Sequence, residues 1–568
     1  MRVAVTQFAT SINVQENLAT CIRMINEAAV CQPSLIVLPE YANTQPSYVD
    51  HQQAWDEALV IDGEFLQSIA AQAKKYDCYI VINVTLRRDG SSLKSKANIS
   101  VTSCLFSPQG ELIHQANKQA LVGHESEFFT YKASDAELVN TVTTPFGKMG
   151  LLTDSASFES SRLLTLSGAQ LLSHSLSTFA MDQSTLHSPA RACENKVFLA
   201  QANKVGALVT QNNEYQEHLI GSGQSQIVAP TGKVLAKLAN NEEGFIFADI
   251  DLSECIDSKK NRPDSTNIIE QRRPALYQKL SEQVNSTVKH ETNEAPETAN
   301  IAIFATYKSN EEAIEDVCYY IENNLSDITQ LPELFFVADK TITNNNEQLV
   351  EIERLSKQLI EQVSAMLRPF QYVCTSLVLD GMHQAVIISE QGLFAAQQQL
   401  HFCQRYQWTT LGDSLNIVEL PLEQGNITVA MLAADDANIP EMIKVAALNN
   451  IHLLLVPFDI QESCEVDYSL ISRAAEHRIC IVAASREKSF TAELVKDNGA
   501  VNTGNKKKVR AQKSVGFIAN LAKNFVIPIR NNSPKFDGYI NKPLVKNQHG
   551  KITKALIFPI AACNKSLY

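Results

Sequence analysis

Apolar and polar residues follow two regular patterns along the first part of the chain. Arg2–Phe8, Ser34–Leu38 and Cys78–Thr85 are short, mainly apolar runs rich in β-branched residues, and they predict buried strands. Val14–Val30 and Glu64–Tyr76 carry apolar residues at helical spacing and predict amphipathic helices. Strands interleaved with helices predict an α/β fold, with a sheet that is covered on both faces or packed on a second sheet.

The same order of signals begins again in the second half of the chain. Asn300–Ala305 resembles the first strand, and LPEL at 331–334 resembles LPEY at 38–41. The later matches pair the turns at 108–110 and 390–392, the segments 147–159 and 425–441, and the segments 190–203 and 472–485. The offset between matched positions stays at roughly 280–290 residues, which predicts a tandem duplication of one whole domain.

Between the two halves, residues 281–299 lose their apolar residues and become polar and charged. Such a composition cannot bury a core and predicts a linker. We therefore expect one domain over 1–280 and a second over 300–568.

Composition narrows the class of protein. A chain of 568 residues is too long for one ordinary core, and 45% hydrophobic with 20% charged residues is typical of a folded globular protein. The net charge of -13 argues against a nucleic-acid or anionic-membrane partner. Twelve cysteines without a CxxC pair predict reduced thiols and no metal site. The first residues do not resemble a signal peptide, and no run approaches the ~20 apolar residues of a membrane span. These features predict a cytoplasmic location.

Several motifs together resemble the nitrilase, or carbon–nitrogen hydrolase, superfamily. They are VLPEY (37–41), Lys118 after an extended run, GKMGLL (147–152), ARACENKVFLAQANKVG (190–206), GSGQSQIVAPTGKVLAKL (221–238) and QRRPALY (271–277). The resemblance covers almost all of 1–280 and continues, weaker but in order, over 299–568. It implies two α-β-β-α sandwich domains, which form an internal pseudo-dimer or assemble into a homo-oligomer, and it implies no cofactor.

The family's chemistry needs a Glu as general base, a Lys that stabilises the tetrahedral intermediate and a Cys that attacks the carbon of an amide or nitrile. The resemblance assigns the first two roles to Glu40 and Lys118. It also implies an acidic residue seven or eight positions after the lysine, which is Glu125, with Glu127 as the alternative.

The nucleophile position holds no cysteine. Counting forward from the GKMG motif places Asp154 there, whereas counting back from Phe158 places Leu152 there and leaves Asp154 at a downstream aspartate of the family. Thr153 and Ser155 are the nearby hydroxyls, and the segment is about two residues shorter than the family pattern. If Asp154 takes the thiol position, Glu40 and Asp154 would share Lys118.

Two further residues lie near the expected site. Cys193 belongs to an amphipathic segment, where a cysteine usually acts as a small buried hydrophobe. His174 follows the predicted strand Gln170–Leu172 and is either a ligand contact or a structural histidine.

The second domain has lost more of the pattern. Glu333 matches the Glu position, but Gln399 stands where the lysine would be. Leu432, Ala433 or Ala434 stands at the nucleophile position, and none of them can attack a carbonyl. This half is expected to be inert and to serve in packing or partner binding.

Three functions remain open. The chain is a non-catalytic member that binds a small amide, amine or acid and regulates or scaffolds a partner enzyme; or it is an atypical amidohydrolase that uses Ser155, Thr153 or an activated water; or it is a structural assembly protein. The retained Glu40 and Lys118 favour the first of these over the third, and the shortened segment disfavours the second.

Overall fold

A computed structural model describes residues 1–88, 98–121, 125–129, 141–154, 158–209, 215–281, 296, 298–306, 308–338, 342, 345–477, 479–490, 512–519 and 555–559. The described residues form two compact units, Met1–Lys260 and Asn261 onward. The division by packing precedes the predicted boundary at residue 280, because residues 261–281 pack with the second unit. Most of the predicted linker 281–299 lies outside the described residues.

The first unit contains two six-stranded mixed sheets. The first sheet has the order β14 (Gly244–Asp249), β1 (Arg2–Gln7), β2 (Leu35–Val37), β3 (Tyr79–Arg87), β4 (Ile99–Phe106) and β5 (Leu112–Asn117). The second has the order β13 (Val234–Lys237), β12 (Gln226–Val228), β9 (Phe198–Ala202), β8 (Leu171–Ser175), β7 (Gly147–Leu152) and β6 (Thr141–Thr144), and a separate hairpin joins β10 (Ala207–Val209) to β11 (Tyr215–Ile220).

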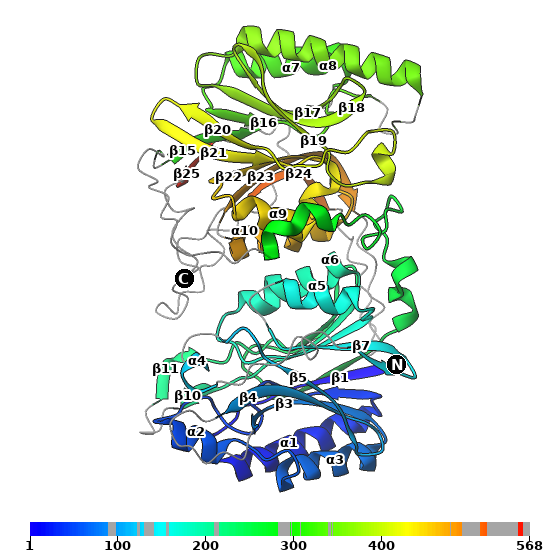
Figure 1. Ribbon diagram of the computed structural model, residues 1–568, viewed down its shortest axis with the longest axis vertical. Coiled ribbons are helices and arrows are strands. Elements are labelled where there is room, and N and C mark those ends of the chain that lie inside the picture. The colour runs from blue at the N-terminus through cyan, green and yellow to red at the C-terminus, as the bar shows by residue number, and fades with distance from the viewer. Residues whose placement is uncertain are drawn as a thin grey trace, which may run out of the picture. The chain divides into compact units, whose positions relative to one another are not determined.

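Helices cover the outer faces of both sheets of the first unit, giving four layers (Figure 1). One apolar cluster fills the space between the sheets, a second packs α1 and α3 on the first sheet, and a third packs α5 and α6 on the second sheet. The helices are α1 (Val14–Ala28), α2 (His51–Glu57), α3 (Glu64–Tyr76), α4 (Glu125–Phe128), α5 (Glu159–Leu166) and α6 (Ser188–Asn195), with short turns η1 (Ala29–Cys31), η3 (Gln183–His187), η4 (Leu252–Cys255) and η5 (Asp257–Lys259).

Local sequence accounts for the ends of these elements. The Asn13 side chain accepts hydrogen bonds from the first amides of α1, as an N-cap does. The turn between β4 and β5 needs Gly110, whose φ is 81° and where a Cβ would lie 2.8 Å from the carbonyl oxygen of Ala70. This turn was expected from the sequence.

The second unit repeats the strand order of the first. One sheet has the order β19 (Gly392–Gln398), β18 (Met382–Ser389), β17 (Tyr372–Leu379), β16 (Ile328–Gln330), β15 (Thr298–Ile303) and β25 (Ala555–Pro559). The other has the order β20 (Ile417–Leu422), β21 (Gly425–Met431), β22 (Leu453–Phe458), β23 (Cys480–Phe490) and β24 (Gln512–Ala519). Chain direction and neighbours match those of the first unit, including the parallel trios β15–β16–β17 and β21–β22–β23, except that β13 has no counterpart among the described strands of the second unit.

Helices α7 and α8 cover one sheet of the second unit, and α9 and α10 cover the other (Figure 1). An apolar cluster again lies between the two sheets. The helical elements are η6 (Pro274–Ser281), α7 (Asn310–Glu322), α8 (Asn346–Met366), η7 (Gln404–Tyr406), η8 (Ala434–Asn438), α9 (Pro440–Ala447), η9 (Glu465–Ser469) and α10 (Leu470–His477).

The predicted elements of the first third agree with the structure to within a few residues at their ends, and α3 has the predicted bounds. One prediction is wrong. His174 was expected just after a strand, but it lies within β8, because the parallel pairing continues to His174 with β7 and to Ser175 with β9. Among the described residues, no helix combines the length and apolar character needed to cross a membrane.

Candidate functional site

Glu40 follows β2 and lies at the carboxyl end of that strand. Its amide donates to the carbonyl oxygen of Leu176, just past the end of β8, and its Oε2 accepts from the Ser177 amide at 3.1 Å. The next residue, Tyr41, has a left-handed φ of 54°, which turns the chain sharply after the glutamate. Glu40 is 3% exposed. It follows a strand of the first sheet and is bonded to the chain after a strand of the second sheet, so both sheets fix its position.

Lys118 follows β5 and brings the cluster together. Its Nζ lies 2.9 Å from Glu40 Oε1 and 2.8 Å from Glu125 Oε1, and the Tyr41 hydroxyl donates to the same Glu125 oxygen at 2.5 Å. The structure thus unites the three residues that the sequence singled out, from β2, β5 and α4. Glu127, the alternative to Glu125, has an exposed side chain on α4.

The two neighbouring carboxylates keep the Lys118 ammonium protonated. Burial raises the pKa of Glu40, and the Lys118 ammonium opposes that rise. Burial alone would lower the pKa of Lys118, but Glu40 and Glu125 outweigh it and raise the pKa above its usual value. Lys118 therefore stays a cation throughout the physiological pH range.

Asp154 is held by the chain after Lys118 and not by its ammonium. Its Oδ1 accepts from the Ala120 amide at 3.2 Å and its Oδ2 from the Ser160 hydroxyl at 2.8 Å. Within the described residues, Glu40 and Asp154 do not share Lys118. Thr153 is 8% exposed, Leu152 packs into the apolar cluster under α5, and Ser155 lies outside the described residues.

The second unit contains the counterpart of this aspartate. Asp436 accepts from the amides of Leu400 and His401, both at 2.8 Å, as Asp154 accepts from Ala120. Leu400 and His401 follow Gln399 just as Ala120 comes two residues after Lys118. This agreement favours the backward count, in which Asp154 is the downstream aspartate and not the substitute for the thiol.

The two units differ in the length of the turn that precedes this aspartate. Leu151 pairs with Ser173 and Met431 pairs with Leu455 at matching places in the parallel sheets. Three positions separate Leu151 from its aspartate, Asp154, but five separate Met431 from Asp436. The two extra residues of the second unit include Ala434, whose φ of 50° marks a sharp turn. None of residues 152–154 in the first unit has such a left-handed φ.

Glu333 and Gln399 occupy the places of Glu40 and Lys118 in the second unit. The Glu333 amide donates to Phe458, just as Glu40 donates to Leu176, and Leu334 after it has a left-handed φ of 40°. The Gln399 amide donates to His383, as Lys118 donates to Val101. The Gln399 side chain bonds the His383 ring at 3.0 Å and the His401 carbonyl at 2.7 Å.

Arg405, on η7, supplies the positive charge that Gln399 lacks. Its guanidinium donates to Asp435 at 2.9 Å and to Asp264 at 3.0 Å. Burial raises the pKa of Glu333 to about 8, and Arg405 is the main group that opposes this rise. Sequence reasoning missed Arg405, because it lies six positions after Gln399 and reaches the site only through the fold.

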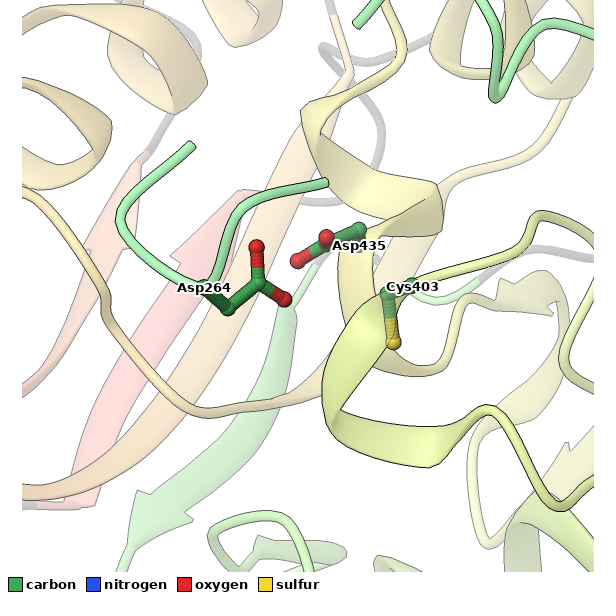
Figure 2. Close-up of side chains that lie close together, drawn as sticks. All are labelled: Asp264, Cys403 and Asp435. Atoms are coloured by element: carbon green, nitrogen blue, oxygen red, sulfur yellow. The ribbon is translucent and has the colours of Figure 1, made fainter. Parts of the chain in front are cut away.

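Figure 2 shows Asp264, Asp435 and the thiol-bearing residue Cys403 close together. One ligand-type atom from each lies within 4.8 Å of the others, a spacing that also suits a metal ion. However, Arg405 already bridges the two carboxylates, and Arg262 Nε lies 3.7 Å from Asp435. Two guanidiniums at these distances repel a further cation, so the geometry is that of an ion-pair network. The expectation of no metal stays a prediction.

His174 and Cys193 are both buried. Neither ring nitrogen of His174 has a hydrogen-bond partner among the described residues, and burial lowers its pKa to about 3. Cys193 is 2% exposed on α6, and its thiol donates to the Ala190 carbonyl oxygen at 3.4 Å. Sequence reasoning also missed Lys204, whose Nζ donates to the Tyr41 carbonyl oxygen at 3.0 Å and whose pKa burial lowers to about 7.

The first unit is similar in sequence to known carbon–nitrogen hydrolases. The carbon–nitrogen hydrolase family model matches residues 2–260, the extent of the first unit. A probable nitrilase of Schizosaccharomyces pombe is 30% identical over 288 residues, covering 49% of this chain and 97% of that protein. An omega-amidase of Xenopus tropicalis is 28% identical over 291 residues, covering 49% of this chain and 96% of that protein. The solved structure of an amidase of Nesterenkonia sp. AN1 is 20% identical in sequence, and the match covers 49% of this chain and 97% of the amidase chain with a TM-score of 0.39. The chain belongs to the carbon–nitrogen hydrolase family.

Proposed function

We propose that the first unit binds a small primary carboxamide, or a related amine or acid, at Glu40 and Lys118 and does not hydrolyse it through a thiol. The observation that carries this proposal is the buried Lys118 ammonium held between Glu40 and Glu125, in a chain segment without cysteine from 105 to 192. A cluster of two buried charges and one partly buried charge is costly to maintain, and its retention without the nucleophile favours a binding role.

The cluster is complementary to a carboxamide. An ammonium group has three hydrogen-bond donors, and the two carboxylates account for two of them. The third donor suits a carbonyl oxygen, while Glu40 suits the amide N–H groups as an acceptor. Two glutamates beside one lysine also disfavour an anionic ligand relative to a neutral amide.

A thiol-free site has lost the usual route to a covalent intermediate. A hydroxyl nucleophile needs a base and donors arranged for it. Thr153 adjoins a turn shortened by two residues, and the carboxylate of its neighbour Asp154 is already bonded to Ala120 and Ser160. These features support binding over turnover.

The proposal is tested by titrating the whole protein with propionamide, propionate and propylamine in a calorimeter, with ammonia release measured in parallel. We expect saturable binding of propionamide without ammonia, and about tenfold weaker binding in Glu40→Gln, which is about 1.4 kcal/mol. Glu333→Gln, the same change at the matching place of the second unit, should leave the affinity unchanged.

Two results would overturn the proposal. Ammonia release that disappears in Glu40→Gln would establish an amidohydrolase, and the absence of binding by all three probes would favour a purely structural role.

A further inference from the structure

Residues 261–281, which we call the strap, follow the first unit in sequence but pack on the second. The strap begins with a tight turn, in which the Arg262 amide donates to the Thr266 carbonyl oxygen and Ser265 has a φ of 72°. The turn places Asp264 on the Arg405 guanidinium at 3.0 Å, and the Thr266 hydroxyl accepts from the Gln404 amide at 2.9 Å. Its side chains thus fix η7 from one side.

A second group of strap residues binds the loop after Gln399. Arg273 donates to the carbonyl oxygens of Leu400, at 2.6 Å, and Gly412. The Tyr277 hydroxyl lies 2.7 Å from the His401 Nε2, and the two rings stack with centroids 5.8 Å apart. These bonds hold the loop at both of its ends.

A third group binds the turn and helix that follow the nucleophile position. Arg262 donates to the Asn438 carbonyl oxygen and lies 3.7 Å from Asp435. Arg272 forms an ion pair with Glu441 at 3.0 Å, and η6 lies beside α9 (Figure 1).

Every site position of the second unit therefore has a neighbour that the strap holds. Gln399 is followed by the bound Leu400 and His401, and Ala434 is followed by Asp435. Glu333 is influenced by Arg405, whose guanidinium lies between Asp264 of the strap and Asp435 of the site. The two carboxylates that Figure 2 draws side by side are the point where strap and site meet.

We propose that the strap is an intramolecular cover that closes the second unit's site, with the Asp264–Arg405–Asp435 fork as its fastening. The cover is built from charged and aromatic side chains that each have a specific partner, and not from an apolar stripe alone. Such a cover opens by local unfolding of the strap without loss of the sheets beneath it. This inference concerns the second unit and does not depend on ligand binding by the first.

Cys403 provides a built-in reporter of the cover. It is 0% exposed, and its Sγ lies 3.6 Å from the Gln399 Nε2 in the second site. Native protein is treated with N-ethylmaleimide, and the modified cysteines are mapped by mass spectrometry over time. We expect slow modification in the unaltered protein and at least about tenfold faster modification of Cys403 in Asp264→Ala with Tyr277→Phe. Cys374, buried between the sheets of the same unit, should stay protected in both.

The matched control is Glu270→Ala, an exposed side chain of the same strap, which should leave the rate at Cys403 unchanged. The proposal is overturned if the double variant does not change this rate. It is also overturned if Cys403 and Cys374 accelerate together, because the strap would then be an inseparable part of the fold. Hydrogen exchange of the unaltered protein gives a test without substitution: the amides of 261–281 should be protected to the same degree as those of 400–412, and exchange at the rate of a free linker contradicts the cover.

Discussion

The two units share the order of their strands apart from β13, which has no counterpart among the described strands of the second unit, but the surroundings of the buried glutamate differ between them. In the first unit Lys118 emerges from the end of β5 and contacts Glu40 directly. In the second unit the same backbone position holds neutral Gln399, and Arg405 on a neighbouring turn provides the charge. The comparison teaches that the same strand-end position can hold a glutamate in two states. Glu40 is ion-paired with Lys118, whereas Arg405 is ion-paired with Asp264 and Asp435, and burial raises the pKa of Glu333 to about 8, so that this side chain is mainly neutral at pH 7.

The units should also respond differently to pH. The Glu40 amide donates to Leu176, and His174 lies two residues before that acceptor. In the second unit the Glu333 amide donates to Phe458, so the matching residue is Val456. The first unit thus buries a neutral base where the second buries an apolar side chain. The second unit instead buries a carboxyl whose pKa is raised to about 8. Acid should weaken the first unit at His174, and alkali should weaken the second unit at Glu333.

The largest expected difference between the units comes from removing the first cation. Lys118→Met leaves Glu40 and Glu125 buried without their partner, and we expect it to cost about 3–5 kcal/mol. Gln399→Met at the matching place removes two neutral hydrogen bonds and should cost about 1–2 kcal/mol. The first unit holds Trp55 and the second holds Trp408. Urea unfolding followed by tryptophan fluorescence therefore reports the first unit in a Trp408→Phe background and the second unit in a Trp55→Phe background. Equal losses at the two positions would contradict the comparison.

The next effect is the pH response of Glu333. Because its folded pKa of about 8 exceeds the ordinary value of 4.5, its contribution to stability is complete below pH 4.5 and is lost as pH rises through 8. Glu333→Gln should remove a decline on the order of 3 kcal/mol between pH 5 and pH 8, measured by Trp408 fluorescence. A variant that declines as steeply as the unaltered protein would show that Glu333 is ionised in the folded state.

His174 should give a smaller effect of opposite sign. Its folded pKa of about 3 lies below the ordinary value of 6.5, since burial, Lys118 and Arg191 all oppose its charge. Its contribution to stability is therefore complete above pH 6.5 and is lost as pH falls toward 3. His174→Val introduces the residue type found at this place in the second unit. It should raise the free energy of unfolding of the first unit by roughly 2 kcal/mol more at pH 5 than at pH 8, as measured by Trp55 fluorescence. The same gain at both pH values would instead indicate better packing.

The smallest effect concerns Tyr41, whose hydroxyl bonds Glu125 in the first unit while Leu334 takes its place in the second. Tyr41→Phe should cost about 1–2 kcal/mol in the unfolding of the first unit, since Glu125 loses a donor and keeps Lys118. Propionamide affinity in the same variant tests whether this bond also orients the cluster. A neutral result for stability would mean that Lys118 alone positions Glu125.

Much of the site could be predicted from the sequence, because its residues stand at the ends of short, strongly patterned strands. Glu40 follows a continuous apolar strand, Lys118 follows an extended run of mixed polarity, and Glu125 lies seven residues after Lys118. The resemblance to the family assigned these three positions, and the fold brings them together because strand ends on one edge of a packed sheet converge in space. The absence of cysteine from this segment is likewise a property of the sequence itself.

Other features were decided by tertiary structure alone. Only the hydrogen bonds to the chain after the lysine position favour the match of Asp154 with Asp436 over its placement at the thiol position. Arg405 and the strap are remote from Glu333 in sequence, and no periodicity connects them. Strand and helix patterns depend on neighbours a few residues away, whereas the partner of a buried charge depends on whatever side chain the finished fold brings within a few ångströms of it.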